Sequence, residues 1–311
     1  MKKSFIIIMC ITALLLSGCG ASETESGGEG LEIITTVFPA YDFARHIAGN
    51  RARVTLLIPP GSESHSFEPT AQDMIRIQNG LLICNGGESE AWVGEMIEGE
   101  ALAISPLYMM ECVEPLEEEV REGMQARESE EEAHEEEFDE HVWTSPVNAA
   151  RICTAICERL SGLDPENAGY YRQNCAEYCE ALYALDAAFR EAAENAAYKT
   201  LIFADRFPVR YFVEEYGFDY YAAFPGCADD AEPSAKTVAF LIDKVREEHI
   251  PAVFYIEFSN EKMADVICED TGCKKLLFHS CHNVTAQELE EGVGYLELME
   301  GNLLNLKEAL G

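Results

Sequence analysis

Positive charge is scarce in this sequence of 311 residues. Lysine and arginine together number 22 against 57 aspartate and glutamate residues, which gives a formal net charge of −35. A chain with so negative a field repels phosphate groups, and this argues against nucleic acid and anionic membrane surfaces as partners. Cations are the natural counterparts of such a chain.

Long apolar runs are also lacking, apart from a short one near the start. Residues 1–20 read MKKSFIIIMCITALLLSGCG, and their apolar run is too short for a membrane span of ~20 residues. Two lysines, this run and small residues before Cys19 are typical of a bacterial lipoprotein signal, with lipid attached to Cys19. We expect a signal peptide over 1–18 and a flexible tether over 19–30. The protein is then exported and lipid-anchored to the outer face of the bacterial cell membrane.

Histidine is the third scarce residue, with seven in the chain, and no His-Glu-x-x-His pattern is present. That absence argues against a metalloprotease of the zincin type. His46 and His249 lie inside helical patterns and are interpreted as surface or packing residues. His65 and His141 instead follow strand or loop breaks, where open α/β sheets bind ligands. These two are the candidate functional histidines.

Cysteine, in contrast, is abundant, with twelve residues. Cys153 and Cys179, and likewise Cys157 and Cys175, would face one another in an antiparallel helical hairpin that turns near Glu166. Disulfides or a thiol cluster could form there, and small buried core residues are an equally good interpretation.

Short β-branched runs alternate with amphipathic segments, which predicts mostly parallel sheets flanked by helices. In the first half we expect helices at 41–49 and 70–80 and strands at 31–39, 53–61, 81–88 and 101–105. In the second half we expect strands at 199–204, 218–224, 251–257 and 275–279, with helices between them. The first set is assigned to an N-terminal lobe over 31–164, and the second to a C-terminal lobe over 198–311.

A long helix is predicted between the two lobes, at 165–197, after a shorter one at about 147–160. It has about 30 residues, or ~45 Å at about 1.5 Å per residue, and this length is sufficient to cross the molecule. The predicted fold is therefore α/β, with two lobes joined by this one backbone helix. Residues 114–137 are dominated by acidic side chains, and we expect them to form a disordered loop.

Six stretches, taken together and in order, resemble the cluster A-I family of metal-binding lipoproteins, the ZnuA-like zinc and manganese receptors of ABC importers. They are VFPAYDFARHIAG, PPGSESHSFEPTAQD, NGGESEAWV, DEHVWTSP, EPSAKTVAFLIDKVREEHIPAVFYIE and GYLELMEGNLLNLKEAL. The resemblance covers essentially the whole mature chain and implies the same two-lobed fold. It also implies a monomer that is not an enzyme, and that captures a divalent transition metal ion for an ABC permease in the membrane.

The resemblance further implies metal ligands in the cleft between the lobes. His65 in ESHSFEP and His141 in DEHVW match the two N-lobe histidine ligands of the family. The family's third ligand opens a helix after the first C-lobe strand, where Asp205 is the nearest carboxylate; it could bind metal or pair with Arg206. The fourth follows the last C-lobe strand, where His279 falls at the matching place.

Several further residues could serve the same site. His282 or Cys281 could substitute for His279, and Glu257 is a reserve ligand or an acceptor for a histidine N–H. Cys281 could instead form a disulfide with Cys227. Imidazole and carboxylate donors suit Zn²⁺, whereas Mn²⁺, the alternative, prefers more oxygen ligands.

The acidic loop contains one histidine, His134, which could form a second and weaker site. Carboxylates without imidazole compete poorly for zinc, so we expect the loop mainly to concentrate cations near the cleft. Two other functions stay open: a surface zinc metallohydrolase, with Asp205 or Glu257 as base, and an adhesion protein.

Overall fold

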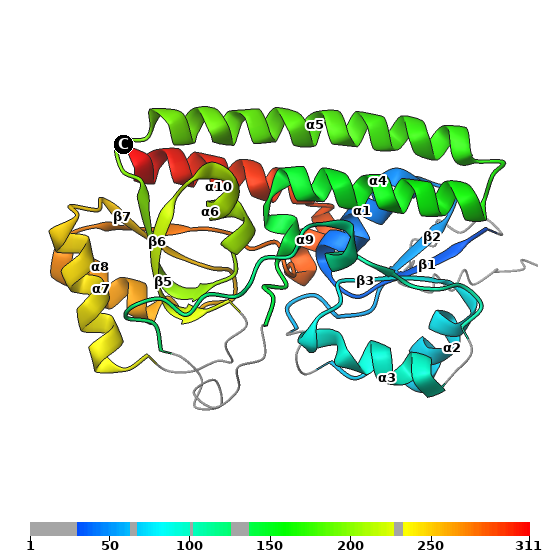
Figure 1. The fold of residues 1–311 in the computed structure, drawn as a ribbon, viewed down its shortest axis with the longest axis horizontal. Helices are drawn as coiled ribbons and strands as arrows, with labels where there is room; N and C mark the ends of the chain where they lie inside the picture. Colours follow the sequence, from blue (N-terminus) through cyan, green and yellow to red (C-terminus); the bar gives the residue numbers. More distant parts are fainter. Residues whose placement is uncertain (1–29, 63–66, 100–101, 126–136, 227–232) are drawn as a thin grey trace, which may run out of the picture.

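The computed structural model describes residues 30–62, 67–99, 102–125, 137–226 and 233–311 (Figure 1). Several predicted features fall outside these ranges, namely the signal peptide, all of the tether but residue 30, Cys19, His65, His134 and Cys227. Among the helices that the structure describes, none combines the length and the apolar character needed to span a bilayer.

The N-terminal lobe is built on a sheet of four parallel strands in the order β2-β1-β3-β4. The strands are Glu32–Thr35 (β1), Arg53–Leu56 (β2), Leu81–Cys84 (β3) and Leu107–Tyr108 (β4). Parallel neighbours need crossover connections, and the helices Phe38–Ala48 (α1), Ala71–Asn79 (α2) and Ala91–Gly99 (α3) lie in these connections. The central strands β1 and β3 are almost wholly buried, as expected where helices cover both faces.

The prediction of a strand at 101–105 is wrong, since the fourth strand lies at 107–108. The backbone N–H of Ala103 donates to the carbonyl of Gln78 at 3.0 Å, near the end of α2. Helix ends leave carbonyls that need partners, and this segment satisfies one of them instead of joining the sheet.

Two long helices lie along the top of the molecule in Figure 1, one over both lobes and the other below it over the right-hand part. They are Pro146–Leu163 (α4) and Ala168–Asn195 (α5), and α5 has 28 residues. Helix α5 packs against α1 and α4 at one end and against the C-terminal helix Tyr295–Leu310 (α10) at the other. It therefore spans both lobes, as predicted for the backbone helix.

The C-terminal lobe repeats the architecture with a parallel sheet in the order β6-β5-β7-β8. Its strands are Thr200–Phe207 (β5), Asp219–Pro225 (β6), Ala252–Tyr255 (β7) and Lys274–Leu277 (β8). The helices are Arg210–Tyr216 (α6), Ala235–Glu247 (α7), Lys262–Thr271 (α8) and Ala286–Glu291 (α9). The predicted fold class, two α/β lobes with parallel sheets, is confirmed.

Residues 114–125 are the described part of the acidic segment after β4, and they contact the folded lobes; the disordered loop expected over 114–137 stays a prediction for the rest. Its apolar residue Leu116 packs against the main core. Arg121 forms an ion pair with Asp219 at the start of β6, so the segment is held against the C-terminal lobe. Residues 126–136 lie outside the described part of the chain.

A buried carboxylate ties three helices together. Asp42 of α1 is fully buried and accepts hydrogen bonds from the Tyr178 hydroxyl of α5 at 2.7 Å and the backbone N–H of Tyr295 in α10 at 3.2 Å. Burial by itself would raise the pKa of Asp42, but His46 and Arg45 hold this pKa below its usual value. The group therefore stays ionised and joins α1 to both neighbours.

The substitution Asp42→Asn should lower the free energy of unfolding by about 2 kcal/mol at pH 7, because hydrogen bonds to a charged acceptor are lost. The pKa of Asp42 is depressed in the folded state, so its contribution is present above the unfolded pKa and is lost as the pH falls through the folded pKa. Urea unfolding at pH 7 and below pH ~4 measures both effects. The exposed Glu300→Gln of α10 is the control, and equal unfolding midpoints for the two variants at pH 7 would contradict this role.

Candidate metal-binding site

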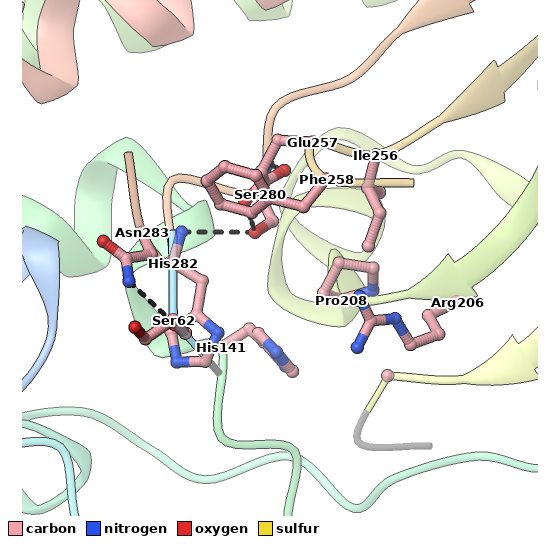
Figure 2. Close-up of a pocket in the computed structure, with 11 residues that line it drawn as sticks. Ser62, His141, Arg206, Pro208, Ile256, Glu257, Phe258, Ser280, His282 and Asn283 are labelled. Atoms are coloured by element: carbon pink, nitrogen blue, oxygen red, sulfur yellow. Dashed lines mark hydrogen bonds between the residues drawn. The ribbon is translucent and has the colours of Figure 1, made fainter. Parts of the chain in front are cut away.

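A pocket between the two lobes is lined by side chains from both (Figure 2). The N-terminal lobe contributes His141, and the C-terminal lobe contributes Arg206, Glu257 and His282. The other lining residues are Ser62, Pro208, Gly226, Ile256, Phe258, Ser280 and Asn283. Polar groups from both lobes thus converge where the sequence predicts a ligand site.

His141 is oriented by the carboxylate two residues before it. Oδ1 of Asp139 accepts the backbone N–H of His141 at 2.8 Å and lies 3.2 Å from its ring Nδ1. With Nδ1 as the donor, Nε2 keeps its lone pair for a metal ion, which is a common arrangement around metal-binding histidines. Burial lowers the pKa of His141, but Asp139 raises it overall. The role of Asp139 is not among the predictions, although the spacing Asp-x-His signals it.

His282 lies on the loop after β8, opposite His141. The two ring centroids are 5.9 Å apart at an angle of 82°, and the His282 ring stacks on Trp143 at 5.5 Å. The indole N–H of Trp143 donates to the carbonyl of Ser280 at 2.8 Å. Zinc binds imidazole nitrogens at about 2 Å, and these two rings line the same pocket.

The same loop is also attached to the N-terminal lobe through Asn283. Its side-chain amide donates to the carbonyls of Pro59 at 2.9 Å and Ser62 at 2.8 Å. Ser62 lines the pocket and precedes His65, the first predicted ligand, by three residues. The segment that contains His65 therefore begins beside this loop. His65 itself lies outside the described residues.

Asp205 and His279 are not among the residues that line the pocket. The carboxylate of Asp205 accepts the backbone N–H groups of Arg206 at 2.8 Å and Ile256 at 3.4 Å, and burial raises its pKa. Nδ1 of the buried His279 accepts the backbone N–H of Cys281 at 2.9 Å. In the structure both side chains hold backbone in place.

Glu257 lines the pocket and also holds the loop after β8. One of its oxygens accepts the backbone N–H of Ser280 at 2.7 Å, and the other accepts the hydroxyl of the same residue. Cys281 is a fully buried cysteine whose pKa is raised by burial. Because Cys227 lies outside the described residues, its disulfide with Cys281 stays a prediction.

Arg206, predicted from the sequence only as a partner of Asp205, lines the pocket. A guanidinium group has no lone pair to offer a metal ion, so this position supplies a charge and not a ligand. Within the described ranges, no three His, Cys, Asp or Glu side chains meet in an arrangement that could hold a metal ion. His141 and His282 are the imidazoles that the pocket brings together.

Two parallel-sheet lobes, a long connecting helix and a polar pocket between them define a two-lobed solute-binding protein. The chain belongs to the ZnuA family, "Zinc-uptake complex component A periplasmic", whose model matches residues 33–309. It is 32% identical over 315 residues to the high-affinity zinc uptake system protein ZnuA of Bacillus subtilis, covering 98% of this chain and 96% of that protein. The zinc-binding lipoprotein AdcA of Streptococcus pneumoniae is 31% identical over 313 residues, covering 99% of this chain but 61% of AdcA.

Solved structures show the same relationship. The Zn(II)-bound ZnuA-like domain of Streptococcus pneumoniae AdcA has a TM-score of 0.74 at 28% identity, covering 90% of this chain and 99% of that one. The metal-dependent lipoprotein YcdH of Bacillus subtilis has a TM-score of 0.74 at 29% identity, with the same coverage of 90% and 99%. Because proteins of this family bind and deliver solutes and are not enzymes, the metallohydrolase alternative is set aside.

A buried acid lies next to the His141 turn. Glu90 is 2% exposed, and burial, with the charge of Glu140 adding to it, raises its pKa to about 7. Glu140 directly precedes His141, and its carboxylate accepts the backbone N–H of Ser89 at 3.0 Å. The pKa of Glu90 therefore lies near neutral pH, and its carboxylate interacts with that of Glu140, the residue before His141.

Ionisation of Glu90 should cost stability as the pH rises. Its pKa is raised in the folded state, so its favourable contribution is present below the unfolded value of about 4.5 and is lost as the pH passes about 7. Glu90→Gln should therefore gain up to about 3 kcal/mol relative to the unchanged protein between pH 4.5 and pH 8. Denaturant unfolding across this range measures the difference in free energy of unfolding between the variant and the unchanged protein. For the exposed Glu88→Gln this difference should not change with pH. If the difference for Glu90→Gln is also independent of pH, the raised pKa of Glu90 is refuted.

Proposed function

We propose that this protein is the exported zinc receptor of an ABC importer, and that it captures Zn²⁺ between its lobes and delivers it to a membrane permease. The observation that carries the proposal is the meeting of His141 and His282, from opposite lobes, in one pocket. Two relatives over nearly the whole chain are named for zinc uptake or zinc binding. Zinc is here the cargo of the protein.

The proposed ligands are His65 and His141 from the N-terminal lobe and His282 from the C-terminal lobe. His282 is favoured over His279 and Asp205 because it lines the pocket and they do not. Glu257 is the further candidate, since its carboxylate lines the same pocket close to the loop of His282. Three imidazoles and one carboxylate would complete the four-coordinate site that zinc prefers.

Zinc is favoured over manganese by the chemistry of these donors. Manganese prefers oxygen ligands, whereas the proposed set has one carboxylate, Glu257, and three imidazoles. His141 and His282 supply two of these imidazoles from the described walls of the pocket. A preference for manganese would need oxygen donors in their place.

The proposed receptor is a monomer held at the outer face of the cell membrane by lipid on Cys19. A tether over 19–30 would let the folded lobes move near the permease while raising their effective concentration there. An adhesive role is not proposed. The laminin-binding protein Lmb of Streptococcus agalactiae has a TM-score of 0.74 but 20% identity, and this likeness shows the fold alone.

The double variant His65→Ala/His141→Ala should bind zinc more than about 100-fold more weakly, because loss of even a supporting partner of a ligand costs roughly 10–100-fold. Isothermal titration of the metal-free mature protein measures the affinity. His249→Ala removes an exposed histidine and should leave the affinity unchanged. Undiminished binding by the double variant would exclude this pocket as the zinc site.

The C-lobe ligand can be identified by comparing His282→Ala with Asp205→Asn. The first removes an imidazole from the pocket, and we expect zinc affinity to fall by at least about 100-fold. The second keeps the shape and a hydrogen-bond acceptor for the N–H of Arg206, so the affinity should stay within about threefold. The opposite ranking in the same titration would favour Asp205 as the ligand.

A further inference from the structure

The end of helix α8 brings two cysteines together. Helix α8 stops at Thr271, and Gly272 turns the chain with a φ of 78°, in the left-handed region. The N–H of Gly272 donates to the carbonyl of Cys268 at 2.9 Å. In this type of helix cap the residue after the glycine packs against the last turn of the helix. That residue is Cys273, and its sulfur lies 3.0 Å from the sulfur of Cys268.

The backbone on both sides of this pair is fixed. Cys268 lies on a helix that packs against β5, β7 and β8. Cys273 directly precedes β8, whose first residue, Lys274, donates its N–H to the carbonyl of Pro251 at 2.9 Å. Both cysteines are partly exposed, so an oxidant in solution can reach them.

A second close pair of thiols provides the contrast. Cys175 and Cys179 stand one turn apart on α5, with their sulfurs 3.9 Å from each other. Side chains at this helical spacing have Cβ atoms about 5–6 Å apart, whereas a disulfide needs about 3.5–4.5 Å. Cys175 and Cys179 instead hydrogen-bond the carbonyls of Cys153 at 3.5 Å and Ala150 at 3.7 Å. In the structure Cys175 and Cys179, like Cys268 and Cys273, are free thiols, so the two pairs differ in geometry and not in bonding state.

We propose that Cys268 and Cys273 form a disulfide in the exported protein. The two thiols lose two protons and two electrons, and the acceptor is the disulfide of an extracytoplasmic oxidant, which leaves as two thiols. The cap of α8 gives the two cysteines the geometry for this bond. The oxidising compartment that the bond needs is inferred from the proposed export. The bond would join the end of α8 to the start of β8, in the sheet whose loop after β7 lines the metal pocket through Ile256, Glu257 and Phe258.

Peptide mapping tests the bond directly, because trypsin releases both cysteines in one peptide, MADVICEDTGCK (263–274). The mature protein is taken from the cell envelope, alkylated with iodoacetamide without reductant, and digested. We expect this peptide to lack alkyl groups and to be lighter than the dithiol form by two hydrogen atoms. Two alkyl groups on the peptide would overturn the proposal. Reduced, purified protein is then treated with oxidised glutathione. A bond that forms under this treatment would show that the geometry permits it and that the compartment does not oxidise it, and no bond would show that the geometry does not permit it.

Thermal unfolding of the metal-free protein provides the second readout. A phosphine reductant should lower the melting temperature by on the order of 4 °C, since a short closed loop restricts the unfolded chain. The shift should be smaller in the double variant Cys268→Ser/Cys273→Ser, which leaves the predicted Cys227–Cys281 bond to respond to reductant, and it should persist in full in Cys175→Ser. The same shift in the Cys268→Ser/Cys273→Ser variant would assign the effect of reductant to another pair and overturn the proposal.

Discussion

The hydrogen bond from the indole of Trp143 to the carbonyl of Ser280, at 2.8 Å, holds the two halves of the pocket together. His141 stands two residues before this tryptophan, and His282 stands two residues after this serine. Both bonded groups are buried, so breaking the bond would leave polar atoms without water to replace the lost partner. The hydroxyl of Tyr295 donates to the carbonyl of Trp143 at 2.6 Å and braces the turn from α10. The separation of the two imidazoles depends on this connection.

Further connections make the two lobes behave as one body. Helix α5 lies along both, the carboxylate of Asp42 accepts hydrogen bonds from α5 and α10, and Arg121 crosses from the acidic segment to Asp219. A wide hinge motion would have to break buried bonds in several places at once. We infer that metal binding proceeds with small lobe motion, and that changes of state concentrate on the loops around the pocket.

Features that depend on interactions between residues close in the sequence could be predicted from it, and features that depend on contacts between distant residues could not. Local signals served well: Gly49 ends α1, and Thr70 caps α2 with Asp73 in a capping box. The placement of residues 114–125 depends in contrast on partners such as Asp219, which is 98 positions away from Arg121. No local pattern reports such a contact.

Prediction of the site residues from the sequence has the same limit. His141 could be found because its motif is contiguous. The choice between His279 and His282, three residues apart on one loop, depends on tertiary contacts. Asn302 clamps His279 through its backbone N–H at 2.7 Å and its carbonyl at 2.7 Å, and Cys281 reverses the chain with a φ of 62°. Only then does His282 line the pocket, and sequence alone does not reveal it.

Arg206 is a basic residue in the pocket of a strongly acidic chain. The net charge of −35 draws cations toward the protein, although salt screens this field beyond a Debye length of about 10 Å. Inside the pocket Arg206 is one of the lining residues, and its guanidinium offers no lone pair to a metal ion. The field of the chain therefore favours the arrival of a cation, and the pocket holds one basic side chain beside its two described imidazoles.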